Sequence, residues 1–401
     1  MSDVLVRLGH SRPTNQPMSD IVLGTPPRPA PRDREGTATA VAAFLGASMA
    51  ANTLAAYRSD WARFERWCQV RGLAALPAQP AALAEYLAEA ATQPAVSAGR
   101  QWRYSPATLA RWVAGIDKAH EVAGLVGPGA HPQVRAVLSG IRRARAMPPE
   151  RRAPLLLDDL ERVVAGVPVA GWPATVAGWR DRALLVMGWV GAFRRSELVG
   201  LVAEDVQPHA EDGLHVLLRR SKTDQEAEGV IRALPYARRR PLLCAPCAWT
   251  AWAGLVSAWE GHDGGPGGRA GTIRALRAIT ACHGHLCAET GLVGNATALA
   301  SSAPSAALFR PLRPDGAIGA GGLTGHAVNS VVKRRAAAAG FPAARLGGHS
   351  LRAGFVTQAF RSGASAHSIM RQTGHRDPAV LEVYSREGAP LVGNAVTELG
   401  L

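Results

Sequence analysis

The sequence predicts a mainly α-helical protein with one small antiparallel β-sheet. Hydrophobic residues make up 47% of the 401 residues, which is enough for well-buried cores. Over most of the chain these residues recur with the spacing of a helix. The exception is residues 214–236, which read as two short strands around a polar turn that contains glycine, the pattern of a β-hairpin.

The first part of the chain is expected to be an arm followed by a helical domain. Residues 1–36 are polar and rich in proline, which predicts a flexible arm. Residues 37–145 predict a compact helical domain. Its first helix begins near Asn52, and a second begins with Ser105 as N-cap and Pro106 as first helical residue. The buried faces of the two helices would be formed by Leu54, Tyr57, Trp61, Phe64 and Cys68, and by Leu109, Trp112, Val113 and Ile116.

A second domain is predicted over residues 154–387. Prolines set among arginines at residues 146–153 suit an exposed linker. Within the second domain, residues 261–306 are dominated by Gly, Ala and Ser. They are expected to form a long loop or insertion with at most a short helix between Thr272 and Ala281.

The last residues, 388–401, form a C-terminal tail. Four apolar residues there suit either a short helix or a frayed end: Leu391, Val392, Val396 and Leu399.

The charge balance favours nucleic acid as the partner. Lys and Arg number 45 against 31 Asp and Glu, which gives a net charge of +14 and an isoelectric point near 10.6. A bias of the genome toward arginine codons is the alternative, but it does not explain the sign of the net charge. The sequence begins without a signal-peptide pattern and contains no long apolar segment, so a cytoplasmic, nucleoid-associated protein with no membrane contact is expected.

Basic residues and one tyrosine in the second domain supply what is needed to break a phosphodiester bond. Arginines can neutralise the charge on the phosphate oxygens, a tyrosine can attack phosphorus, and a lysine or histidine can handle protons. Arg194 stands three residues before Glu197, and Lys222 lies in the turn of the predicted hairpin. The remaining candidates lie near the C-terminus, in the order His349, Arg352, His375 and Tyr384.

In this order, these residues resemble the tyrosine recombinase, or phage integrase, family. The shared pattern is an R-x-x-E-L box, a hairpin lysine, H-x-x-R, G-H and a tyrosine nine residues later. The resemblance covers about residues 50 to 390. It implies a two-domain clamp around double-stranded DNA, with the helical domain as the core-binding module. It also implies a homo-tetramer acting on two DNA sites, in which a helix in the C-terminal tail would dock on a neighbouring subunit. An accessory DNA-bending protein is a further partner that the resemblance suggests.

The resemblance also implies a role for each candidate residue. Arg194 and Arg352 would hold the scissile phosphate, and His375 would hydrogen-bond one of its oxygens. His349 would exchange a proton with the tyrosine, and Lys222 would protonate the leaving 5′ hydroxyl. Tyr384 would attack to form a 3′-phosphotyrosyl enzyme. Glu197 would orient Arg194, while the adjacent Arg195 is expected to be a surface residue or a DNA-backbone contact.

Two other functions stay open at this stage. A type IB topoisomerase uses the same chemistry to relax supercoils, and a protein that binds DNA without cutting it would keep the charge. The complete set of motifs argues against the second alternative. No cofactor is predicted.

The cysteines raise a separate question. The segments "CAPC" and "CHGHLC" supply two imidazoles and four thiols, those of Cys244, Cys247, Cys282 and Cys287, a set that suits a tetrahedral zinc site. The irregular spacing favours unligated, reduced cysteines instead.

Overall fold

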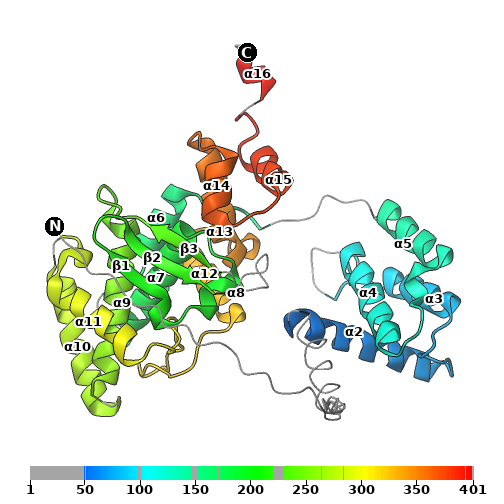
Figure 1. Cartoon of the computed structure of the whole chain (residues 1–401), viewed down its shortest axis with the longest axis horizontal. Coiled ribbons are helices and arrows are strands. Elements are labelled where there is room, and N and C mark those ends of the chain that lie inside the picture. Colours follow the sequence, from blue (N-terminus) through cyan, green and yellow to red (C-terminus); the bar gives the residue numbers. More distant parts are fainter. Residues whose placement is uncertain are drawn as a thin grey trace, which may run out of the picture. The chain divides into compact units, whose positions relative to one another are not determined.

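The chain forms two compact units, Met1–Pro148 and Pro149–Leu401 (Figure 1). The computed structural model describes residues 49, 51–96, 101–145, 152–169, 171–219, 229–262, 264–282, 284–392 and 394–399. The predicted arm at residues 1–36 therefore lies outside the described residues, as does most of the predicted linker. None of the described helices is long and apolar enough to cross a membrane.

The first unit is a small helical bundle, as predicted. Its helices are α2 (Ala51–Val70), α3 (Pro80–Thr92), α4 (Pro106–Val122) and α5 (Pro132–Ala144), with a 3-10 turn η1 (Pro128–Ala130). The Ser105 hydroxyl caps α4 by accepting from the backbone N–H of Thr108 at 3.1 Å, which confirms the predicted start. Phe64, Leu83 and Trp112 are fully buried at its centre.

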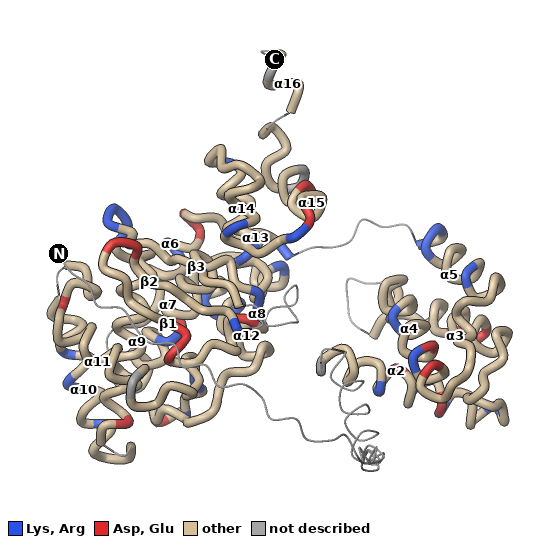
Figure 2. The backbone as a smooth tube through the Cα atoms, in the orientation of Figure 1, with Lys and Arg blue, Asp and Glu red and all other residues tan. Residues whose placement is uncertain are grey.

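Basic side chains lie on the outside of this bundle. Figure 2 shows Lys and Arg on α4 and α5, where they include Arg111, Lys118, Arg142 and Arg143. In the described part of the unit, eleven Lys and Arg stand against six Asp and Glu. The unit thus carries net positive charge.

The second unit is mostly helical and packs around two buried helices, α7 (Ala174–Val190) and α9 (Ala245–Glu260). The other helices are α6 (Leu157–Ala165), α8 (Arg195–Gly200), α10 (Gly265–Ala281), α11 (Thr290–Ser302), α12 (Gly325–Ala338), α13 (Gly348–Arg361), α14 (Ala366–Thr373), α15 (Pro378–Gly388) and α16 (Ala395–Glu398). Four 3-10 turns join them: η2 (Ala203–Asp205), η3 (Pro241–Leu243), η4 (Leu286–Ala288) and η5 (Ala343–Arg345). The predicted mainly helical fold is confirmed.

The small sheet contains the predicted hairpin and one further strand. β2 (Gly213–Leu218) and β3 (Val230–Leu234) pair antiparallel, with Val216 opposite Arg232. β1 (Val206–His209) pairs antiparallel with the other edge of β2. β1 was not predicted because three of its four side chains are exposed, so its sequence shows no apolar alternation.

The expectation of a long loop at residues 261–306 is wrong. α10 and α11 occupy most of that segment and pack on α9, as Figure 1 shows. Their buried residues have helical spacing: Thr272, Leu276 and Ile279 on α10, and Leu292, Ala296 and Leu299 on α11. Tertiary packing therefore stabilises helices in a segment whose composition alone favours a loop.

Two glycines explain why α10 can lie so close to α9. A Cβ atom at Gly268 would stand 2.8 Å from the carbonyl oxygen of Trp259, and one at Gly271 would stand 2.6 Å from that of Ala258. Both distances are too short for a real side chain. The glycines that suggested a loop are thus needed for close helix packing.

Candidate active site

Four of the predicted site residues come from three consecutive helices at the end of the chain. His349 and Arg352 lie in the first turns of α13, and Tyr384 lies on α15. His375 follows Gly374, which ends α14 in the left-handed conformation with φ 68°. A glycine adopts this conformation without strain, so the chain can turn back there and return His375 toward α13.

Arg194 and Glu197 form a linked pair at the start of α8. Arg194 is the N-cap residue, and its backbone N–H donates to the Glu197 carboxylate at 2.8 Å. Its guanidinium Nη1 donates to the same carboxylate at 2.6 Å. Glu197 is buried, whereas the Arg194 side chain is 18% exposed. The carboxylate thus orients a guanidinium that still reaches solvent.

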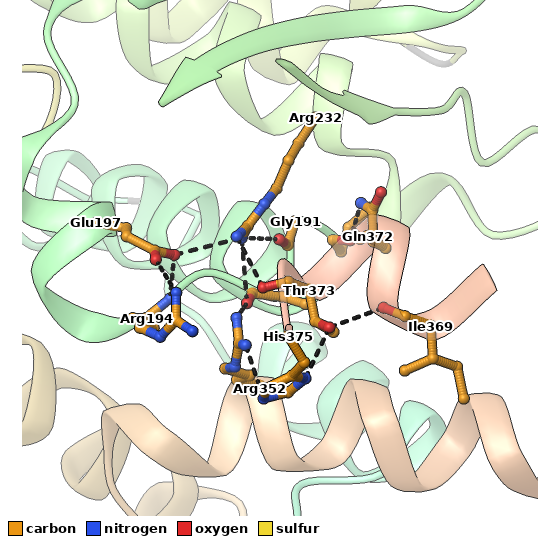
Figure 3. A network of polar contacts seen from close by, with 11 residues as sticks. Gly191, Arg194, Glu197, Arg232, Arg352, Ile369, Gln372, Thr373 and His375 are labelled. Carbon is orange, nitrogen blue, oxygen red and sulfur yellow. Dashed lines mark hydrogen bonds and ion pairs between the residues drawn. The ribbon is translucent and has the colours of Figure 1, made fainter. Parts of the chain in front are cut away.

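Arg232 on β3 is a site residue that the sequence analysis missed. Its buried guanidinium donates to the carbonyl oxygens of Gly191 at 2.8 Å, Ala192 at 3.3 Å and Thr373 at 2.9 Å. It also lies 3.4 Å from a carboxylate oxygen of Glu197. Figure 3 shows this side chain joining the end of α7, the end of α14 and the carboxylate. The alternation of β3, which buries Arg232 and Leu234, was the only available sequence signal.

Arg352 and His375 are hydrogen-bonded to each other. The buried Arg352 donates through Nη1 to the carbonyl oxygen of Ala192 at 2.7 Å and through Nη2 to His375 Nε2 at 2.9 Å. Because arginine can only donate, His375 Nε2 accepts and its proton is on Nδ1. Nδ1 lies 2.8 Å from the Thr373 hydroxyl, which itself donates to the Ile369 carbonyl (Figure 3).

Tyr384 and His349 are in direct contact. The Tyr384 hydroxyl lies 3.0 Å from His349 Nε2. The centroid of the Tyr384 ring is 6.2 Å from that of His349 and 6.3 Å from that of His375. A cavity of about 510 Å³ opens beside this pair, lined also by Arg152, Thr357 and Asp377. The nucleophile candidate is thus accessible and has a base within hydrogen-bond reach.

Burial and the positive charge gathered at the site lower the pKa values of two groups, Arg352 and His375. Burial and the neighbouring Arg194 lower the pKa of Arg352 to about 9. Burial, followed by the charges of Arg352, Arg194, Arg232 and His349, lowers the pKa of His375 to about 3. Without an anion, His375 is therefore neutral, in agreement with its role as an acceptor.

Lys222 and the neighbouring Arg220 lie outside the described residues. Arg195 is exposed, while Arg219 forms ion pairs with Glu204 and Asp205 in the turn η2, which precedes β1. Arg219 is thus held by carboxylates, so Lys222 remains the predicted lysine of the site.

The cysteines are grouped differently from the predicted set. Cys244, Cys247 and Cys287 come together with His285, and the ligand atoms of all four lie within 4.8 Å of one another. Cys282 is not part of this group, and its thiol lies 3.6 Å from the Glu289 carboxylate. Three of the four cysteines named for a zinc set therefore lie together, and His285 takes the place of Cys282.

Comparison with known proteins adds one sequence relative and several solved structures. The chain is 28% identical over 358 residues to the integrase/recombinase xerD homolog of Selenomonas ruminantium, covering 88% of this chain and 87% of that protein. No family model matches.

Among solved structures, the comparison found a lambda integrase (75–356) dimer bound to a COC' core site, with a TM-score of 0.46, 15% identity and coverage of 89% of this chain and 96% of that chain. XerH site-specific recombinase bound to its palindromic difH substrate has a TM-score of 0.43, 13% identity and coverage of 80% and 73%.

Replacing Arg232 should destabilise the second unit strongly. Arg232→Met leaves the buried carbonyl oxygens of Gly191 and Thr373 without this donor, whereas that of Ala192 keeps Arg352. Each buried acceptor that loses its partner costs roughly 1–3 kcal/mol, so we expect a loss of at least about 2 kcal/mol, measured by urea unfolding. The exposed Arg239→Met serves as control and should change stability by less than about 0.5 kcal/mol. Equal effects of both changes would contradict the described network.

His375 should make stability depend on pH in the acidic range. Its pKa is about 3 in the folded protein and 6.5 is its ordinary value, so below about pH 6.5 only the unfolded chain takes up the proton. The wild type should therefore lose urea resistance more steeply than His375→Asn as the pH falls from 7.5 to 5. Parallel curves for the two proteins would show that the folded state does not hold His375 neutral.

Proposed function

We propose that this chain, which belongs to the tyrosine recombinase family, is a site-specific DNA recombinase that cuts and rejoins strands through a 3′-phosphotyrosyl intermediate. The observation that carries the proposal is the 3.0 Å contact between the Tyr384 hydroxyl and His349 Nε2, next to a group of buried arginines. A tyrosine that has both a base and an anion-binding group beside it suits attack on a phosphodiester.

In the cleavage step, the Tyr384 oxygen forms a bond to the scissile phosphorus and its proton passes to His349 Nε2. A phenol has a pKa near 10, so a base at hydrogen-bond distance is needed for attack at neutral pH. The bond from phosphorus to the 5′ oxygen breaks, and that oxygen takes a proton from Lys222. The reverse sequence, with a 5′ hydroxyl from another strand, rejoins the DNA.

Arg194 and Arg352 neutralise the charge that grows on the phosphate oxygens. A guanidinium has five N–H donors. The contacts of Arg352 with Ala192 and His375 use two of these groups, so others can serve the phosphate. The exposed side of the Arg194 guanidinium is available to the phosphate, while Glu197 fixes the orientation of this guanidinium. Prearranged donors of this kind are usually the largest contribution to catalysis.

His375 changes its role when phosphate binds. After burial, the positive charge of Arg352 is the next cause of the low pKa of His375. The negative charge of a bound phosphate raises that pKa. We propose that Arg352 then donates to the phosphate, and that His375 takes up a proton on Nε2 and donates to a phosphate oxygen.

We further propose that the basic first unit binds double-stranded DNA as the core-binding module, and that four chains act on two DNA sites. The tail carries exposed apolar side chains, Leu391, Val396 and Leu399 among them, which suit docking on a neighbouring subunit. An accessory DNA-bending protein would assist assembly. These assignments are independent of the chemistry at Tyr384.

A covalent adduct with DNA is the most direct test of the function. Wild-type protein incubated with nicked DNA that carries its candidate site should form an adduct that survives denaturation, in a buffer without added Mg²⁺. Cleavage next to the nick releases a short DNA fragment that carries the leaving 5′ hydroxyl. Because this fragment diffuses away, it cannot rejoin the strand, and the adduct accumulates. Tyr384→Phe removes the attacking hydroxyl and should abolish the adduct.

Tyr236→Phe is a matched control that removes a tyrosine hydroxyl elsewhere in the unit, where it donates to the His209 carbonyl. This variant should form the adduct at close to the wild-type level. An adduct that persists in Tyr384→Phe would contradict the proposed nucleophile. Relaxation of a supercoiled plasmid that lacks the site would favour the topoisomerase alternative.

A further inference from the structure

Four side chains of types that bind metal ions lie close together where residues 261–306 pack on α9. They come from other elements than Tyr384, which lies on α15. Cys244 immediately precedes α9, and Cys247 lies in its first turn. His285 and Cys287 come from the turn η4 between α10 and α11. The two sequence segments are 38 residues apart, yet the four ligand atoms lie within 4.8 Å of one another.

The separations match those of a tetrahedral metal site. With metal–sulfur bonds of about 2.3 Å and a metal–nitrogen bond of about 2.0–2.1 Å, zinc ligands stand about 3.8 Å apart for two sulfurs and about 3.6 Å for sulfur and nitrogen. Here the Cys247 and Cys287 sulfurs are 3.5 Å apart. His285 Nδ1 is 3.3 Å from the Cys247 sulfur and 3.9 Å from the Cys287 sulfur.

The imidazole of His285 is already oriented for binding through Nδ1. Its other nitrogen, Nε2, lies 3.4 Å from the carbonyl oxygen of Arg238. A carbonyl can only accept, so this contact places the proton on Nε2 and leaves the Nδ1 lone pair facing the sulfurs. Metal-bound histidines commonly have such a second contact, which fixes their tautomer.

The surroundings also suit a site with net negative charge. Three thiolates around one Zn²⁺ leave a charge of −1, and Cys244 and Cys247 are buried. The guanidinium of Arg182 is buried nearby and donates to the carbonyl oxygens of Pro241 and Leu242. Burial lowers the pKa of Arg182, and negative charge on Cys247 and Cys244 acts in the opposite direction. A buried cation thus balances the sulfurs.

We propose that Cys244, Cys247, His285 and Cys287 bind one Zn²⁺ in a closed, tetrahedral structural site. Three thiolates and one imidazole are a common ligand set for structural zinc, and four protein ligands leave no position for a reacting water. The ion joins the start of α9 to the turn between α10 and α11. It therefore fixes residues 261–306 to α9 in the second unit. This site does not depend on the chemistry at Tyr384.

Metal content of the purified full-length chain tests the site. We expect close to one zinc ion per wild-type chain by elemental analysis, released when a mercurial reagent blocks the thiols. Cys287→Ser and His285→Gln should lose most of the zinc. The matched controls Cys282→Ser and His262→Gln change residues outside the cluster, where the His262 ring contacts Ala258 and Arg274, and they should keep it.

A second measurement covers the case in which the ligand variants fail to fold. Wild-type protein loaded with Co²⁺ in place of zinc should show the intense visible bands of tetrahedral cobalt together with thiolate charge-transfer absorption. Wild-type protein that binds no zinc or cobalt, with free thiols or with a Cys247–Cys287 disulfide, would overturn the proposal. Zinc retained in full by Cys287→Ser would overturn this ligand set.

Discussion

The second unit depends on how it holds three arginines together, two of them buried and the third partly exposed. Burial, and after it the positive charges of Arg194 and Arg232, lower the pKa of Arg352, because like charges that lie close together repel one another. Burying like charges is costly unless hydrogen bonds and opposite charges compensate for them. One carboxylate, that of Glu197, contacts two of these arginines directly. The arrangement leaves positive charge in excess, which is what an anionic substrate requires.

The end of helix α7 supplies the remaining compensation. The carbonyl of Gly191 accepts from Arg232, and that of Ala192 accepts from both Arg232 and Arg352. Carbonyl groups at a helix C-terminus carry partial negative charge and have no partner within the helix. Ala192 has φ 46°, a conformation that side-chain-bearing residues rarely adopt. We attribute this local strain to the need to aim its carbonyl at the two guanidiniums.

The sequence predicts much of the site because its chemistry is concentrated in local motifs. His349 and Arg352 are three residues apart, as are Arg194 and Glu197, but each pair alone is a weak signal. The order of all the motifs along the chain, which resembles one family, is what predicts these residues. Arg232 could not be found in this way. Its partners include backbone carbonyls from distant segments. Because every residue has a backbone carbonyl, the sequence does not show which of them will accept a hydrogen bond from an arginine.

Residues 261–306 show the same limit of sequence-based prediction for the fold. A glycine-rich composition favours a loop, but Gly271 is needed because α9 is close, and only the folded chain shows this proximity. The sequence also offers four thiols and two imidazoles for one zinc site, but only the folded chain shows that His285 lies with three of the cysteines and that Cys282 does not. Local propensity and periodicity therefore predict helices and motifs well, whereas contacts between distant segments require the structure.

Chemical rescue of an arginine variant can show whether the guanidinium cluster serves a scissile phosphate. Arg194 is suited to this because it is partly exposed, so a small ion can reach the space that it leaves. Arg194→Ala should slow single-turnover cleavage of nicked DNA by about 10²–10³-fold, as expected for the loss of one prearranged donor. Added guanidinium should restore part of the rate, while NaCl at the same ionic strength should not, and the neighbouring Arg195→Ala should cleave nearly normally. Unchanged cleavage by Arg194→Ala would contradict a role for the cluster in catalysis.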